Sequence, residues 1–422
     1  MEITFLDTVL FVTYFLLLFI SIFWMLVLFS TRKDKEKEKK LSTEPFFSTI
    51  VPAYNEEKSI IATLQSLIDL DYPERKKEVI IVNDGSTDNT RELVEGFIKD
   101  NANSNIILIN QENHGKGRAM NEGLKVAKGK YFACLDADSF IHSNALKKML
   151  PIFEEDKDVA AVCPLLKVKK PESILQKVQW CEYIINMFYK FLNSKVNCIH
   201  VTPGPFSVYN TEVIRDLGGF SEETITEDLE IAIRMQKHNY RIVQVFDAIV
   251  ETVAPNTWRE LFWQRIRWYK GSVDNTIKYK ELMFNKKYGD FGFIRMPTII
   301  LSGVIAIVLV TALLQSILSK SYHLLLYLTD IKFDFLTLIR NLNPHFNFLS
   351  LPFSKMFIAA TLMSISFFVM IYSYRLVKEK ISNHGRTFIS MLTYLSVYGI
   401  FITFVWIYIA FMFVSGKKNA WF

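Results

Sequence analysis

The chain contains 422 residues, of which 50% are hydrophobic, 14% aromatic and 22% charged. Glycine and proline are few, at 16 and 12 residues, which excludes a collagen-like, disordered or low-complexity chain. The net charge of +6 is small and dispersed, which argues against nucleic-acid binding. The composition is that of a membrane protein that carries a soluble domain.

Four uncharged runs are long enough to cross the hydrocarbon core of a bilayer, which needs about 20 helical residues. They cover residues 9–29, 299–318, 357–374 and 388–414. The segment 32–40 holds six basic residues, and basic loops lie on the cytoplasmic side of membranes, so we expect the N-terminus outside and residues 30–298 inside. The aromatic but charge-interrupted stretch 322–351 is expected to lie in the external interface rather than to cross.

The expected organisation therefore has four parts. An N-terminal membrane helix (1–30) is followed by a basic cytoplasmic linker (31–45), a soluble α/β domain with interfacial helices (46–290), and a membrane region of about three helices (291–422). The four cysteines, Cys134, Cys163, Cys181 and Cys198, show no C-x-x-C spacing, which argues against a disulfide framework or a zinc site. A reducing compartment is expected.

In the soluble domain, β-rich runs alternate with helix-like stretches, from FSTIVPAY through EVIIVND, NIILIN and KYFACLDAD to VAAVCP. This alternation predicts βαβ units and a doubly wound parallel sheet. Ligands bind such sheets at the carboxyl ends of the strands. The polar residues at these ends include Tyr54 and Glu56 after the first run, Asp84 at the end of the second, and Asp136 and Asp138 after the fourth.

Three of these segments have both a structural and a functional interpretation. Asp136 and Asp138, separated by one small residue, suit a hard divalent cation that keeps positions open for a phosphate, whereas alone they would be read as a solvated acidic turn. Asp84, in VNDGSTD, can equally belong to a turn or a helix cap. Lys116 lies between two glycines in HGKGRAMN, so it can approach a phosphate closely.

The segment ITEDLEIAIRM predicts a helix that starts near Thr226, Glu227 and Asp228. A helix cap and an acidic first turn would explain all three residues. The functional interpretation is that Asp228 accepts the proton of an attacking acceptor hydroxyl.

The segment TWRELFWQRIRWYKGS predicts a helix on which Gln264, Arg267 and Trp268 share one face. Its other aromatic residues fit an amphipathic helix at a membrane surface. Both interpretations hold together, because the indole of Trp268 suits stacking on a sugar while Arg267 can neutralise a leaving diphosphate. A second aromatic helix is predicted over residues 178–194.

In this order, VPAYNE, NDGS, DAD, TPGPFSVYN, TED and QRIRW resemble the membrane-integrated family 2 glycosyltransferases, which include cellulose, hyaluronan, chitin and poly-N-acetylglucosamine synthases. The resemblance covers about residues 46–271 and, more loosely, the spans. It implies a GT-A fold and inverting, metal-dependent transfer of a hexose from a nucleotide sugar. It also implies a multi-pass protein of the cell membrane with a cytoplasmic catalytic domain.

The resemblance implies roles for individual residues. Asp136 and Asp138 would hold Mg²⁺ or Mn²⁺ on the donor diphosphate, and Asp228 would be the catalytic base, with Glu227 as the next candidate. The substrate-binding residues that it implies are Tyr54, Glu56, Asp84, Lys116, Asp136, Gly204, Pro205, Phe206, Gln264, Arg267 and Trp268.

The expected donor is a UDP-sugar, with UDP-N-acetylglucosamine implied by the resemblance, and the expected acceptor is a polysaccharide or a lipid-linked sugar. Acceptor identity stays open, since Thr202 and Pro203 stand where related synthases often have Ser-Gly or Cys-Gly. One alternative is a single-addition transferase acting on a polyprenyl phosphate or another lipid, although such enzymes typically lack the QRIRW pattern. Another is a non-catalytic membrane scaffold that binds nucleotide sugars. Contact with membrane lipids is expected, and a homo-oligomer or an export partner stays open.

Overall fold

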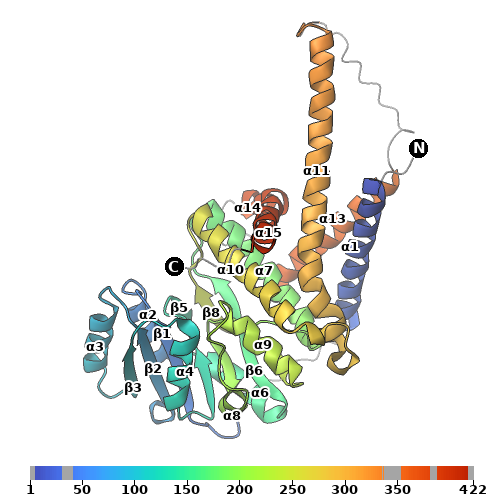
Figure 1. Ribbon diagram of the computed structural model, residues 1–422. Coiled ribbons are helices and arrows are strands. Elements are labelled where there is room, and N and C mark those ends of the chain that lie inside the picture. The colour runs from blue at the N-terminus through green and yellow to red at the C-terminus, as the bar shows by residue number, and fades with distance from the viewer. Residues whose placement is uncertain (1–4, 31–40, 335, 337–352, 381–386, 417–422) are drawn as a thin grey trace.

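The computed structural model describes residues 5–30, 41–334, 336, 353–380, 387–416 (Figure 1). Its α/β part is built on one eight-stranded sheet in the order β3-β2-β1-β4-β7-β6-β8-β5. The strands are β1 (Phe47–Ala53), β2 (Lys77–Asp84), β3 (Ile106–Gln111), β4 (Tyr131–Cys134), β5 (Ser139–Ile141), β6 (Val159–Val168), β7 (Ser207–Asn210) and β8 (Arg241–Thr252).

The expectation of a parallel sheet is confirmed for one half and only in part for the other, where β6 and β8 pair in parallel but β7 and β5 do not. Strands β3, β2, β1 and β4 are parallel, as the alternating pattern predicts. Strand β7 is antiparallel to both β4 and β6, and β5 is antiparallel to β8. The chain re-enters the sheet between β4 and β6 through β7, which runs in the opposite direction to both. Because β7 has only four residues, its sequence shows no clear period and its direction could not be predicted.

Helices cover both faces of the sheet. Side chains alternate along β1, so that Phe47 and Val51 enter one core while Ile50 enters the other. The helices of the α/β part are α2 (Ile60–Ile68), α3 (Thr90–Asp100), α4 (Lys116–Val126), α5 (Ala145–Met149), α6 (Pro151–Glu155), α7 (Ile174–Lys195), α8 (Thr211–Asp216), α9 (Glu227–Lys237) and α10 (Trp258–Lys278). The first core includes residues of α2, α3, α5 and α7, and the second residues of α4, α8 and α9.

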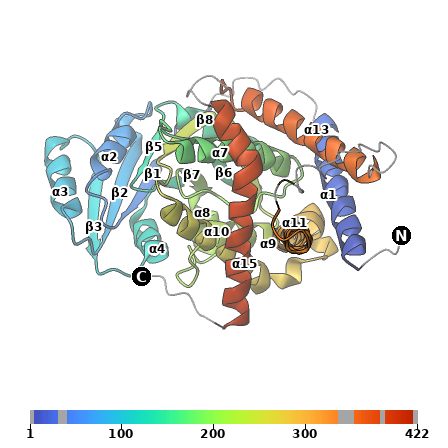
Figure 2. The same cartoon turned by 90° about the horizontal axis from the view of Figure 1, so that it is seen from above.

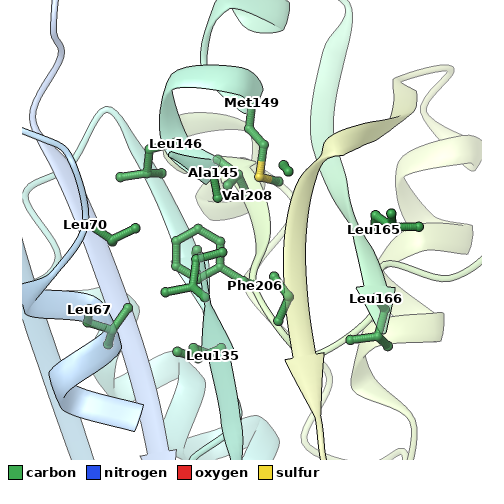
Figure 3. Packing of buried hydrophobic residues seen from close by; sticks show 14 of the residues in the cluster. Leu67, Leu70, Leu135, Ala145, Leu146, Met149, Leu165, Leu166, Phe206 and Val208 are labelled. Atoms are coloured by element: carbon green, nitrogen blue, oxygen red, sulfur yellow. The ribbon is translucent and has the colours of Figure 1, made fainter. Parts of the chain in front are cut away.

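Phe206 belongs to the first core. Its side chain is fully buried and lies among Leu135, Leu146 and Val208 (Figure 3). The residue has a positive φ of 57°, which turns the chain sharply just before β7. The Phe206 side chain therefore lies in the core and does not line the cavity reached by Gly204 and Pro205, and its implied role in substrate binding stays a prediction.

Four helices in the described ranges are long and apolar enough to cross a membrane: Asp7–Ser30, Phe291–Asp330, Met356–Leu376 and Phe388–Val414. They coincide with the four predicted runs. The helices are α1 (Phe5–Ser30), α11 (Met296–Asp330), α13 (Phe353–Leu376), and α14 (Thr387–Thr393) continued by a π-helical turn (Tyr394–Tyr398) and α15 (Gly399–Val414).

Helix α11 is longer than the sequence pattern predicts. It continues through residues 322–330, which were expected in an interfacial segment, and residues 337–351 of that segment lie outside the described part of the chain. The span Phe291–Asp330 has 40 residues, or about 60 Å of helix, whereas a hydrocarbon core is about 30 Å thick. Figure 1 accordingly shows α11 extending beyond α1 and α13.

The α/β part is joined to the candidate spans through α7 and α10. Helix α7 contacts α13 and α14, while α10 contacts α11 and α15 (Figure 2). Both were predicted as helices, and α10 packs directly on the spans: Ile266 forms a buried cluster with Val405, Trp406 and Ile409 of α15. Thus α10 connects the face that carries Gln264, Arg267 and Trp268 to the membrane helices.

Candidate active site

A cavity of about 610 Å³ lies where the end of β4 and the start of α9 face the middle of α7 and of α10. It brings together motifs that lie more than 100 residues apart in the sequence. The predicted site residues that line it are Lys116, Asp136, Asp138, Gly204, Pro205, Glu227, Asp228, Gln264, Arg267 and Trp268.

Lys116 links the first acidic motif to the second. Its Nζ lies 2.6 Å from Asp136 Oδ1 and 3.0 Å from Glu227 Oε1. Burial alone would lower the pKa of Lys116, but Asp136, Glu227 and Asp228 outweigh it and hold the pKa well above its usual range. The lysine therefore stays charged and partly neutralises the acidic cluster.

The local fold explains why Lys116 points there. Lys116 is the first residue of α4, and Gly115 precedes it with a φ of +90°, a conformation that side chains rarely tolerate. The N–H groups of His114 and Gly115 donate to the Asp84 carboxylate at 3.0 and 2.9 Å, and the Gln111 side chain donates to it at 2.6 Å. Asp84 thus fixes the turn that leads to Lys116.

Asp136 follows β4 and Asp138 precedes β5, so a tight strand connection holds the two carboxylates. Burial raises the pKa of Asp138, and the charge of Asp136 raises it further. Gly204 leaves the space beside them open, because a Cβ there would lie 2.8 Å from both Asp136 Oδ2 and Lys116 Nζ. Two close, poorly neutralised carboxylates beside open space fit a hard divalent cation.

Protein side chains alone do not complete a metal site in the described ranges, since no group of three or more His, Cys, Asp and Glu residues has metal-binding geometry there. A cation held by Asp136 and Asp138 would therefore need oxygen ligands from a substrate or water.

Asp228 lies at the start of α9, as the sequence predicts. Burial and the adjacent Glu227 raise the pKa of Asp228 to about 7, while Lys116 opposes this shift. The backbone carbonyl of Asp228 accepts hydrogen bonds from Thr202 N at 3.3 Å and Thr202 Oγ1 at 2.8 Å. These bonds fix the segment that leads into Gly204 and Pro205 beside the carboxylate.

On α10, Gln264, Arg267 and Trp268 share the face that lines the cavity, as predicted. Arg265, which lies between them in the sequence, has a separate role. Arg265 is fully buried and forms an ion pair with Glu182 of α7; its Nε also donates to Tyr398 Oη at 3.0 Å. Its guanidinium lies over the ring of Trp268, 4.2 Å from the ring centroid. Arg265 therefore ties Trp268 to α7 and to a membrane helix. The sequence clue was its offset of one position from Gln264, which turns the charge by about 100° around the helix, away from the cavity and toward α7.

Three other predicted residues lie outside the cavity. Tyr54 is 46% exposed after β1, and Glu56 is near enough to Asp138 and Asp136 for their charges to add to the burial that raises its pKa. Asp84 is 3% exposed, with its carboxylate occupied by the hydrogen bonds described above. Substrate binding by Asp84, which the family resemblance implies, stays a prediction.

The cavity also contains residues that sequence reasoning missed. It continues past Asp228 along α7 to Lys190 and Asn193, then to His200 and Arg295. None of these lies in a recognisable motif, and only their placement on α7 and at the start of the second span brings them together.

Comparison with known proteins now assigns the family. Residues 48–218 match the family model for glycosyl transferase family 2. The chain is 32% identical over 283 residues to the poly-beta-1,6-N-acetyl-D-glucosamine synthase of Staphylococcus epidermidis, which covers 63% of this chain and 67% of that protein. The chain belongs to glycosyltransferase family 2. The synthase of the same name from Staphylococcus aureus strain COL is 32% identical over 270 residues, covering 62% of this chain and 64% of that protein.

The fold agrees with this family. A mannosyltransferase from Pyrobaculum calidifontis, solved in complex with GDP-Man and Mn²⁺, superposes with a TM-score of 0.57 at 22% identity and covers 76% of this chain and 90% of that one. The expected GT-A-type α/β fold is thus confirmed. This family 2 glycosyltransferase is a membrane protein with four candidate spans.

The junction of α9 and α10 provides a test of the site's architecture. A Cβ on Gly271 of α10 would lie 2.5 Å from Thr226 Cγ2 and closer still to its Oγ1, and Asn275 Nδ2 donates to the same hydroxyl at 3.0 Å. Gly271→Ala should therefore push α10 away from α9, lower stability by about 1–3 kcal/mol and reduce sugar transfer at least tenfold. Transfer rate and thermal stability of the purified protein are the measurements.

The matched control is Gly96→Ala in α3, where a Cβ meets nothing within 4 Å. It should leave transfer unchanged and raise stability by about 0.5–1 kcal/mol, because alanine favours a helix. Indistinguishable behaviour of the two variants would show that the contact between α9 and α10 does not shape the site.

Proposed function

We propose that this protein is an inverting, metal-dependent hexosyltransferase that adds N-acetylglucosamine from UDP-N-acetylglucosamine to a growing β-linked polysaccharide. Its catalytic domain comprises residues 46–290 and lies on the cytoplasmic side of the cell membrane. The observation that carries this proposal is the single cavity in which Asp138, Asp228 and Trp268 meet beside membrane helices. The choice of sugar and polymer rests on the 32% identity to the staphylococcal synthase.

In the proposed reaction, Asp228 takes the proton of the acceptor hydroxyl while the acceptor oxygen forms a bond to the anomeric carbon. The bond from that carbon to the phosphate oxygen breaks, and UDP leaves with its electrons. Because this is one displacement, the anomeric configuration inverts. The raised pKa of Asp228 suits this role, since a base works best when its pKa lies near the working pH.

Cationic side chains would stabilise the departing diphosphate. An ammonium group has three N–H donors, and the ion pairs of Lys116 with Asp136 and Glu227 leave one for a phosphate oxygen. Arg267 lines the cavity as a further cation. Asp136 and Asp138 would hold Mg²⁺ or Mn²⁺, which when bound supplies additional positive charge beside the diphosphate.

Polymer extension requires a surface that receives the terminal sugar after each addition. Trp268 provides an indole plane that lines the cavity, and Arg265 beneath it restricts its movement. Aromatic planes stack on sugar rings while tolerating a shift by one unit, so Trp268 is the proposed acceptor platform.

The metal proposal predicts that Asp138→Asn lowers turnover by on the order of 100-fold, because the cation that offsets diphosphate charge loses a ligand. EDTA should abolish transfer by the wild type, and Mg²⁺ or Mn²⁺ should restore it. Asp100→Asn, at the exposed end of α3, is the control and should change nothing. Transfer is measured as release of UDP, and full activity in EDTA contradicts the metal proposal.

The base proposal predicts that Asp228→Asn retains donor binding while transfer falls by roughly 100-fold or more, since the amide cannot accept the proton. Because the pKa of Asp228 is raised to about 7, the carboxylate becomes protonated as pH falls through that value. The kcat/KM of the wild type should therefore decline below about pH 7 and level off above it. Unchanged turnover in the variant would shift the role to Glu227.

The platform proposal predicts that Trp268→Phe shortens the polymer while donor binding is largely kept, because the smaller ring offers less stacking area. Trp263→Phe is the control: Trp263 is on the same helix, 41% exposed and outside the cavity lining. Products made from radiolabelled donor are sized for each protein. Equal product lengths in all three would make Trp268 a membrane anchor, and a wild-type product of one sugar on a lipid would defeat the polymerase proposal.

A further inference from the structure

The end of the cavity nearest the second candidate span is cationic. Lys190 of α7 and Arg295, which immediately precedes α11, both line it. Lys190 is 7% exposed, and among the described residues its Nζ has no hydrogen-bond partner other than the Cys163 thiol; the Nε of Arg295 has no partner there either. Among the described residues, no carboxylate lies within ion-pair distance of either side chain, so neither charge is directly paired.

His200 is close enough to both cations for their charges to act on its imidazole. An Nη of Arg295 donates to His200 Nε2 at 2.6 Å, so that nitrogen carries no proton. Burial lowers the pKa of His200 well below its usual range, and the charges of Arg295 and Lys190 lower it further. The imidazole is therefore neutral, its proton is on Nδ1, and the net charge of the group of three comes from Lys190 and Arg295.

A buried cation, Lys190, and a partly buried one, Arg295, are costly to fold when no acidic partner accompanies them. Removing a charge from water is unfavourable unless an opposite charge or several hydrogen bonds replace the lost hydration. Burial lowers the pKa of Lys190, and Cys163 and Asp228 oppose this only in part. Local rules of folding are broken in this way mainly at functional sites, where a ligand completes the interaction.

The missing partner is an anion, and its place favours a phosphate at membrane level. The donor diphosphate is already matched at the other end of the cavity by Lys116 and the Asp136–Asp138 pair. Arg295 lies in the first turns of the span Phe291–Asp330, where the phosphate groups of lipids would be close to the protein. A neutral polysaccharide alone would not require two cations without acidic partners.

We propose that Lys190, His200 and Arg295 form a subsite for a phosphate group, and that a lipid carries this phosphate into the membrane end of the cavity. Arg295 and Lys190 would pair with the phosphate oxygens, and His200 would donate from Nδ1. The inference rests on the proposed function in one respect: the lipid phosphate would hold the acceptor in the cavity with its hydroxyl near Asp228.

Binding to purified protein in neutral detergent tests the proposal with defined probes: inorganic phosphate, dihexanoyl phosphatidic acid, a polyprenyl monophosphate, and dihexanoylglycerol as the phosphate-free match. We expect the two lipid phosphates to bind at least tenfold more tightly than both inorganic phosphate and dihexanoylglycerol. Inorganic phosphate binding as tightly as the lipids would overturn the lipid assignment. Equal binding of phosphatidic acid and dihexanoylglycerol would overturn the phosphate subsite.

Variants locate the binding. Lys190→Met and Arg295→Met should each weaken phosphatidic acid binding by about tenfold or more, and either one suffices if the other fails to fold. Lys195→Met is the control, because Lys195 is an exposed lysine on the same helix outside the cavity lining. The affinity for UDP-N-acetylglucosamine should stay unchanged in all three. An equal loss of donor affinity in the cavity variants would assign the cations to the donor diphosphate and overturn the proposal.

The thermal midpoint of Lys190→Met distinguishes a ligand-binding lysine from one that stabilises the fold. Without ligand, Lys190→Met should raise the thermal midpoint, because an unpaired buried charge is replaced by an apolar side chain of similar length. A lowered midpoint together with unchanged lipid binding would make Lys190 structural. Since these are binding and stability measurements, they decide the subsite even if no UDP-sugar is turned over, and so remain separate from the proposed function.

Discussion

The ion pairs of Lys116 with Asp136 and Glu227 are the interaction on which the active site depends. Four carboxylates converge from the end of β4 and the start of α9, and like charges so close together would repel. One lysine bridges the two elements and offsets part of this repulsion. Burial, together with the charges of neighbouring carboxylates, raises the pKa values of Asp138 and Asp228, which leaves one carboxylate suited to a cation and the other to a proton.

The surrounding framework holds this charge cluster against the membrane helices. Thr202 fixes the segment that leads into Gly204 and Pro205 to the carbonyl of Asp228, and the close approach of Gly271 to Thr226 fixes α10 against α9. Arg265 then joins α10 to Glu182 on α7 and Tyr398 in the fourth candidate span. A buried ion pair of this kind contributes little net stability, but breaking it leaves an uncompensated charge, so it specifies one arrangement. Movement of the spans would thus be transmitted directly to Trp268.

How much the sequence predicted depended on the length and regularity of each pattern. The four parallel strands and helices α9 and α10 have clear periods, and Asp136 and Asp138 after β4 meet Asp228 at the start of α9 in one cavity, at the strand-end edge of the sheet. Strand β7 has four residues and gives no period, so its antiparallel pairing could not be predicted. Phe206 stands beside Gly204 and Pro205 in the motif, yet a positive φ turns its side chain into the core, and sequence adjacency cannot reveal that.

The cavity is electrostatically polar along its length, with carboxylates at the sheet end and cations at the membrane end. Residues of the first end come from motifs, because donor chemistry requires fixed residue types at fixed spacing. Lys190 and Arg295 belong to no motif; they lie on α7 and at the start of a candidate span. From the sequence alone, each would be interpreted as a side chain that buries its apolar stem and extends its charge into water. The burial of Lys190 and of the Arg295 Nε separates them from that interpretation, since a snorkelling cation keeps its charged group in water. This difference between the two ends would orient the ligands. A diphosphate bound with a divalent cation fits the carboxylates at the sheet end. An anionic group that brings no cation fits Lys190 and Arg295 at the membrane end. The acceptor oxygen and the departing diphosphate would then lie on opposite sides of the anomeric carbon, as a single displacement requires, with Asp228 on the acceptor side.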